Sequence, residues 1–257
     1  MNANDDMADS KRIKLCISTG MWQRPAVFEM FAEGVDFLRK TFIDEVDIHC
    51  AVAGSEGELS KKLCLSYKNF HYVEAPNQPL GVKMNKSLEV ARSLNPDYCL
   101  MVGSDDLIGK NLMEKYISVM NQGIDFSFLT DCYFFDTVSK QGLYWAGYSK
   151  PNNKGNAAGI GKLISRSLLD KIKWNCFPPG FDRILDTGFD RQIQKVQHTS
   201  IPINLKEENL FALDIKSATN MTPFNRWDNC NFMDGYALLF ENLPEHLATK
   251  IYGKQYR

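Results

Sequence analysis

Short apolar runs and amphipathic stretches alternate through the first half of the chain. Each apolar run ends in glycine, proline or polar residues, as a strand buried in a parallel sheet does. The pattern predicts strands over 13–19, 46–53, 70–74 and 98–102, and helices over 26–40, 59–66 and 81–94. This alternation favours parallel strands with right-handed crossovers, an arrangement typical of nucleotide-binding half-domains.

The second half is less regular. Its pattern predicts helices over 107–120, 166–172, 187–196, 236–243 and 245–252, and strands over 125–135, 142–148, 162–165, 199–205 and 210–215. Residues 150–161, rich in Gly, Asn, Lys and Pro, predict a mobile loop. We expect a disordered tail over 1–12 and a single domain over 13–257, with a nucleotide half (13–106) and an acceptor half (107–257).

Composition narrows the class of protein. A hydrophobic content of 44% and a charged content of 24% suit a packed globular core. The net charge of -1 argues against a protein that coats nucleic acid generally. Seven cysteines without a Cys-x-x-Cys pair favour a reducing compartment, so we expect a cytoplasmic protein. No apolar run approaches the roughly 18 residues of a membrane span, and no membrane or obligate protein partner is expected.

Candidate chemistry begins where the strand over 98–102 ends, in Gly103, Ser104, Asp105 and Asp106. Two adjacent carboxylates repel each other unless a cation or hydrogen bonds compensate. Ligands of open α/β sheets bind outside the carboxyl ends of the strands. A divalent cation with a phosphate as its other ligand is therefore one interpretation. An Asp-rich turn that caps the next helix is the other.

Five segments between residues 13 and 222 form a larger pattern. They are Ser18-Thr19 with Arg24-Pro25, Gly81-x-Lys83-x-Asn85, Asp97 to Asp106, Ala158 to Arg166 with Leu185-Asp186, and Asp214 to Asn220. Their order and spacing resemble family-2-type glycosyltransferases of the GT-A fold, and are similar to glycosyltransferase-like proteins of bacteriophages and large viruses. One departure is the first position of the acidic motif, often Asp in the family, which is Gly103 or Ser104 here.

This resemblance implies an α/β fold of the GT-A type, a three-layer α/β/α sandwich with a mostly parallel central sheet. It implies Mn²⁺ or Mg²⁺ as cofactor, with Asp106 as a metal ligand and Asp105 facing both the ribose and the metal with its water shell. It also implies a nucleoside-diphosphate sugar as donor, which we take as a UDP-sugar. The candidate nucleotide contacts are Thr19, Arg24, Lys83, Asn85 and Asp105.

An acceptor hydroxyl needs a general base. Asp186 and Asp190 are the candidates, and their spacing of four places both on one face of a helix. By resemblance Asp186 matches the family position better. The alternative is that Asp186 caps the helix while Asp190 favours its dipole. His198 is a weaker candidate as an extra metal ligand.

The acceptor stays open between a glycan and a hydroxylated base of phage DNA, such as 5-hydroxymethylcytosine; a viral protein would act in the host cytoplasm. Residues 162–206 hint at DNA because positive residues outnumber acidic ones. The positive residues are Lys162, Arg166, Lys171, Lys173, Arg183, Arg191, Lys195 and Lys206, against Asp170, Asp182, Asp186 and Asp190. A nucleotidyltransferase and a non-catalytic sugar- or nucleotide-binding module are further alternatives.

Overall fold

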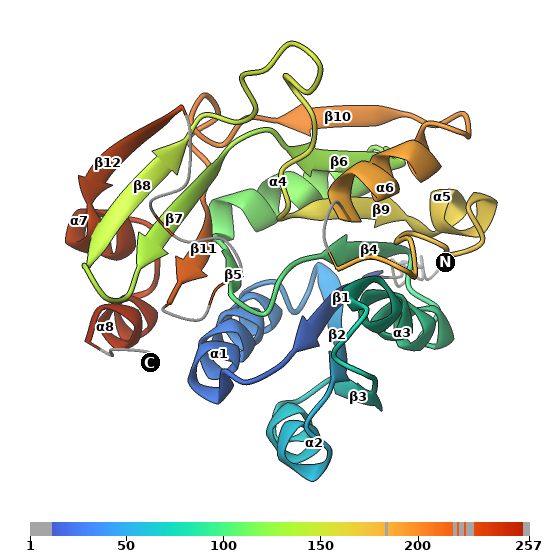
Figure 1. Ribbon diagram of the computed structural model, residues 1–257, viewed down its shortest axis with the longest axis horizontal. Helices are drawn as coiled ribbons and strands as arrows, with labels where there is room; N and C mark the ends of the chain where they lie inside the picture. The colour runs from blue at the N-terminus through green and yellow to red at the C-terminus, as the bar shows by residue number, and fades with distance from the viewer. Residues whose placement is uncertain (1–11, 183–184, 218–219, 221–223, 225–228, 254–257) are drawn as a thin grey trace, which may run out of the picture.

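The computed structural model describes residues 12–182, 185–217, 220, 224 and 229–253, and it contains two β-sheets (Figure 1). The central sheet runs in the order β10 (Ser200–Ile203), β6 (Phe126–Leu129), β9 (Lys162–Ser165), β4 (Tyr98–Met101), β1 (Ile13–Met21), β2 (Val46–Gly54) and β3 (Phe70–Glu74). Strands β3, β2, β1 and β4 are parallel, and β10 is parallel to β6. Only β9 is antiparallel to its neighbours, β4 and β6.

Helices cover both faces of this sheet. The helices are α1 (Pro25–Thr41), α2 (Glu58–Leu65) and α4 (Lys110–Asn121) on one face, and α3 (Leu80–Ser93), α5 (Arg166–Lys171) and α6 (Leu185–Ile193) on the other. Successive side chains of a strand point to opposite faces of the sheet, so alternate residues of β1 pack against helices on different faces. Leu15 and Ile17 pack with Phe28 of α1, whereas Cys16 packs with Leu88 of α3. The predicted three-layer sandwich with a mostly parallel sheet is confirmed.

The second sheet lies beside the first (Figure 1). Its strands are β12 (Cys230–Asp234), β8 (Gln141–Trp145), β7 (Cys132–Asp136), β11 (Ala212–Lys216) and β5 (Asp106–Ile108). On one face of this second sheet, Phe134 packs into the hydrophobic core that the central sheet shares with α1 and α4. The other face, with Phe135 and Leu213, packs against α7 (Gly235–Phe240) and α8 (Glu245–Gly253).

The prediction of one strand over 125–135 is wrong, because β6 and β7 belong to different sheets. The chain turns at Asp131, a fully buried carboxylate. Asp131 accepts hydrogen bonds from the backbone of Leu205 (2.7 Å) and Lys206 (3.1 Å) and from the Tyr144 hydroxyl (3.0 Å). These donors satisfy a carboxylate that would otherwise be costly to bury, so they stabilise the crossing between the sheets.

Two helices begin more than one residue away from their predicted first residue. The helix expected from Leu107 begins only at Lys110, because Leu107 belongs to β5 and lies in the core beneath α7 and α8. The helix expected from Thr187 begins at Leu185, so Asp186 lies within its first turn and is not its N-cap. Ser165 does cap α5, since its hydroxyl accepts a hydrogen bond from the Leu168 backbone.

The predicted disordered tail falls almost wholly on residues 1–11, outside the described residues, and the division into a nucleotide half and an acceptor half stays a prediction.

Within the described ranges, every helix falls short of the length and hydropathy that crossing a bilayer would require.

Candidate functional site

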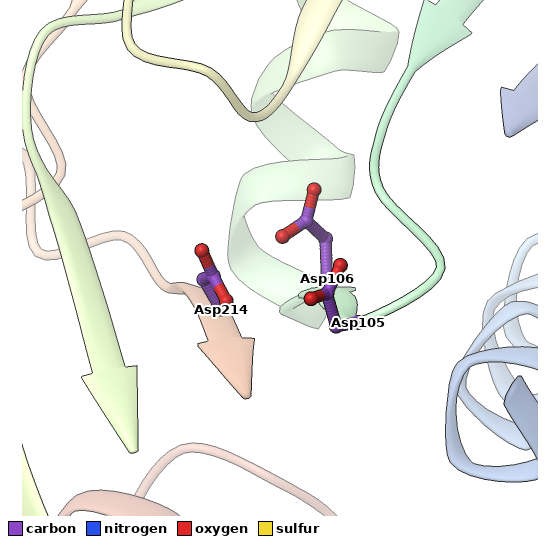
Figure 2. Close-up of side chains that lie close together, drawn as sticks. All are labelled: Asp105, Asp106 and Asp214. Carbon is purple, nitrogen blue, oxygen red and sulfur yellow. The ribbon is translucent and has the colours of Figure 1, made fainter. Parts of the chain in front are cut away.

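Three carboxylates meet where β4, β5 and β11 come together. Asp105 lies in the turn after β4, Asp106 begins β5, and Asp214 lies in β11 directly opposite Asp106 in the antiparallel register. One oxygen from each carboxylate lies within 4.8 Å of the other two. Figure 2 shows the three side chains gathered at this point. The predicted Asp105–Asp106 pair is thus part of a larger acidic group.

The turn over residues 103–106, which we call the acidic turn, folds back on itself at Gly103. The Asp106 backbone donates to the Gly103 carbonyl (3.2 Å), and the Gly103 backbone donates to the Asp106 carboxylate. A Cβ at position 103 would lie 2.7 Å from the Asp105 carboxylate and 3.0 Å from that of Asp106. A side chain at position 103 would therefore force at least one of these two carboxylates to move.

Cationic and amide groups surround the three carboxylates. Arg24, just before α1, donates to Asp105 at 2.9 Å, and the Asn220 amide donates to the same oxygen at 2.8 Å. The Lys216 ammonium lies 2.6 Å from Asp214, two residues away on the same face of β11. These contacts offset part of the negative charge.

The three carboxyl groups titrate differently. Burial, then Asp214 and Asp105, raise the pKa of Asp106 well above its usual value. Burial, only partly offset by Lys216, raises the pKa of Asp214 to about 6. Burial would also raise the pKa of Asp105, but the charges of Arg24 and Lys216 outweigh it, so that this pKa is lowered. The raised pKa values of Asp106 and Asp214 mean that the site resists ionisation of all three carboxyl groups at once, and a bound cation would favour that ionisation.

The oxygen atoms present fit a divalent metal ion. Oδ1 of Asp214 is buried and accepts no hydrogen bond from the described residues. Carboxylate oxygens are the ligands that Mg²⁺ and Mn²⁺ prefer. Among the described residues, these three form the one group of His, Cys, Asp or Glu close enough to share a metal. His198 is not in it; its Nδ1 lies 2.8 Å from the Val196 carbonyl.

The predicted nucleotide contacts separate into two sets. Arg24 lies at the acidic group, and Thr19, near the end of β1, has a buried hydroxyl without a hydrogen-bond partner among the described residues. Lys83 is only 2% exposed, and its ammonium donates to the Met21 carbonyl at 2.6 Å. Asn85 exchanges two hydrogen bonds with the backbone of Phe177 (2.8 and 3.2 Å). In this structure both Lys83 and Asn85 are engaged with backbone groups.

The two candidate bases lie on α6. The Asp186 carboxylate is 2.6 Å from the ammonium of Lys162, which is 2% exposed and also donates to the Ala158 carbonyl (2.7 Å). Asp190 makes no hydrogen bond or ion pair through its side chain with the described residues. Burial, with a smaller contribution from Asp186, raises the pKa of Asp190 to about 6 despite the charge of Lys162.

Sequence reasoning assigned no role to Asp214, Lys216 or Lys162. The signal for the first two was the segment Asp214-Ile215-Lys216, where opposite charges two residues apart on a strand share a face. In the sequence, Lys162 stands only as one of the positive residues over 162–206 that hint at DNA. Because it is buried beside Asp186, it is not available to phosphates of DNA, and Arg183 of the same basic segment lies outside the described residues.

The layering of the fold and the acidic group after β4 define a GT-A-like structure. Among solved structures, the chain is similar to S. aureus TarS, a GT-A glycosyltransferase. TarS 1–349 gives a TM-score of 0.50 at 12% identity over 74% of this chain, and TarS gives 0.52 at 14% identity over 80%. A197 from STIV gives a TM-score of 0.42 at 12% identity over 78% of this chain and 84% of its own.

This chain spans 58% of TarS 1–349 and 37% of TarS, less than two thirds of either. No protein-family model and no curated protein sequence matches it. At these identities the comparisons establish the fold alone.

Proposed function

We propose that this protein is a metal-dependent glycosyltransferase, which moves a sugar from a nucleoside-diphosphate sugar to an acceptor hydroxyl. One observation carries the proposal: three carboxylates converge at the carboxyl end of a parallel strand in a GT-A-like fold, and a buried oxygen of one of them has no hydrogen-bond partner among the described residues. Open α/β sheets bind their ligands at this edge.

Asp105, Asp106 and Asp214 would hold Mn²⁺ or Mg²⁺. Such an ion acts as a Lewis acid that stabilises negative charge on the departing diphosphate. Arg24 supplies a fixed positive charge beside Asp105, at 2.9 Å, where it can also contact a diphosphate oxygen. Lys216 balances Asp214 and keeps the site from becoming too negative to accept an anionic donor. Thr19 offers the nucleotide a buried hydroxyl that has no hydrogen-bond partner among the described residues.

Asp186 is the proposed general base. Its contact with Lys162 orients the carboxylate, which would accept the proton of the acceptor hydroxyl. In an inverting displacement the hydroxyl oxygen attacks the sugar carbon, its proton passes to Asp186, and the nucleoside diphosphate leaves with the bonding electron pair. Asp190 is the alternative base, one helical turn away.

Calorimetry of UDP binding with Mn²⁺ and with EDTA tests the donor half of the proposal. We expect binding that requires Mn²⁺ and is lost in Asp106→Asn, a change that keeps an oxygen for the Gly103 backbone. Asp44→Asn, at an exposed position, is the matched control. Tight UDP binding to the Asp106 variant would remove the metal assignment.

The products separate the remaining alternatives. Incubation with a panel of nucleotide sugars, with and without carbohydrate acceptors and duplex DNA that contains 5-hydroxymethylcytosine, should release nucleoside diphosphate. Release of pyrophosphate from a nucleoside triphosphate would instead indicate a nucleotidyltransferase. Binding without turnover of any sugar would indicate a non-catalytic binding module.

A further inference from the structure

A pocket of about 210 Å³ opens beside α6, and none of the three carboxylates lines it. Its walls come from α6, from β6, from the residues around β10 and from the loop that leads into β9. In Figure 1 these elements lie together on the β10 side of the central sheet. Nothing in the metal-site chemistry described above uses this pocket.

The apolar wall of the pocket is aromatic. Phe128 lines it next to the buried Phe126, and the two rings are stacked with centroids 5.1 Å apart. Both residues line the pocket, and their stacking restrains the half-buried Phe128 ring. A fixed aromatic face suits the C–H face of a sugar ring.

The remaining walls offer hydrogen-bonding groups suited to hydroxyls. They include the amides of Asn156 and Gln194 and the carboxylate of Asp190, which has no hydrogen bond or ion pair with the described residues. His198 adds an acceptor, because its Nδ1 lies 2.8 Å from the Val196 carbonyl and must donate to it. In the neutral ring, Nε2 is then the free acceptor.

The position of the pocket relates it to the proposed base. Asp190 and Asp186 are four residues apart on α6, about one helical turn. Gly155, Asn156 and Ala157 form another wall and lead directly to the segment that carries Lys162, the partner of Asp186. A group bound here therefore lies within reach of the base.

We propose that this pocket binds a saccharide ring of the acceptor, so that the acceptor is a carbohydrate and not a base in duplex DNA. The inference rests on the proposed glycosyltransferase function. An aromatic face with carboxylate, amide and imidazole groups matches a polyhydroxylated ring. A DNA strand would bring phosphates, which require positive side chains, and none of the described residues that line the pocket is Lys or Arg.

Binding can be tested without donor or metal. Saturation-transfer NMR on the full chain, with a panel of methyl glycosides of hexoses and N-acetylhexosamines at millimolar concentration, should detect at least one bound glycoside. Phe128→Ala should weaken that binding by about 3- to 10-fold, as expected for loss of an aromatic contact. Asp190→Asn should also weaken it, whereas Arg191→Ala, exposed on the same helix, should not.

The outcomes distinguish this inference from the proposed function. Asp106→Asn should bind the glycoside normally while it loses Mn²⁺-dependent UDP binding. If UDP and Mn²⁺ bind but no glycoside does, or if Phe128→Ala and Asp190→Asn bind it as well as the wild type, the saccharide pocket is wrong and the transferase proposal stands. If a glycoside binds but no nucleotide does, the transferase proposal fails and the pocket stands.

Transfer to hydroxymethylated DNA that is unaffected by Phe128→Ala would overturn the carbohydrate assignment.

Discussion

Asp106 and Asp214 face each other across the antiparallel pair of β5 and β11, although they belong to distant parts of the chain. The Ile215 backbone donates to the Asp105 carbonyl at 2.8 Å, which fixes β11 against the acidic turn. Closure of the second sheet therefore completes the site. The group of three carboxylates forms only when the residues around 105 and around 214 fold together.

Gly103→Ala should impair the metal site more than the fold. The added methyl group would lie 2.7 Å from Asp105 and 3.0 Å from Asp106, so at least one carboxylate must move. We expect weaker Mn²⁺-dependent UDP binding in calorimetry. Gly159→Ala is the control, because its added carbon would make only an ordinary contact, at 3.5 Å with Asp186. Equal binding by the two variants would show that the acidic turn tolerates a side chain.

Asp186→Asn should bind donor normally and lose transfer by about 10²- to 10⁴-fold, the usual contribution of a general base. Asp190→Asn should mainly raise the KM for acceptor, because we place that carboxylate in the saccharide pocket. Steady-state kinetics with both substrates varied measures the two effects. If Asp190→Asn is the inactive variant and Asp186→Asn is active, the roles of the two residues are reversed.

Lys83 should make folding stability depend on alkaline pH. Burial lowers its pKa to about 8, against 10.5 for an ordinary lysine. Between these values the unfolded chain binds more protons than the folded chain, so the free energy of unfolding rises with pH. Relative to Lys83→Met, the wild type should therefore gain stability as the pH rises from about 8 to about 10. Urea denaturation measures this difference.

The control for this pH effect is Lys86→Met, on the same helix but with an exposed ammonium. The stability difference between the wild type and this variant should stay nearly constant over the same pH range. A constant difference for Lys83→Met as well would show that Lys83 stays charged in the folded protein.

The loop over residues 150–161 should become protected when ligands bind. Asn156 and neighbouring residues line the saccharide pocket, and the segment contains no helix or strand. Hydrogen exchange should slow there on addition of nucleotide sugar with a bound glycoside. Exchange in α2, which contributes nothing to either site, should not change. An unchanged loop under saturating ligands would contradict a role in acceptor binding.

Local patterns in the sequence determined the alternation of strands and helices through residue 102 and placed Asp105 and Asp106 after a buried strand. Both follow from hydrophobic periodicity, which reports the face that each residue buries. The same pattern identified Asp186 and Asp190 as neighbours on one helix. It could do so because residues four apart on a helix share a face whatever the rest of the chain does.

Only the tertiary structure decided which strands pair. The pattern over 125–135 reads as one strand, yet Asp131 turns the chain from one sheet to the other because donors from residues 144, 205 and 206 surround it. In the same way Asp214 joins Asp106, and Lys162 joins Asp186, through long-range packing. Periodicity specifies the buried face of a strand but not its neighbour, and so the third carboxylate and the partner of the proposed base became visible only in the folded chain.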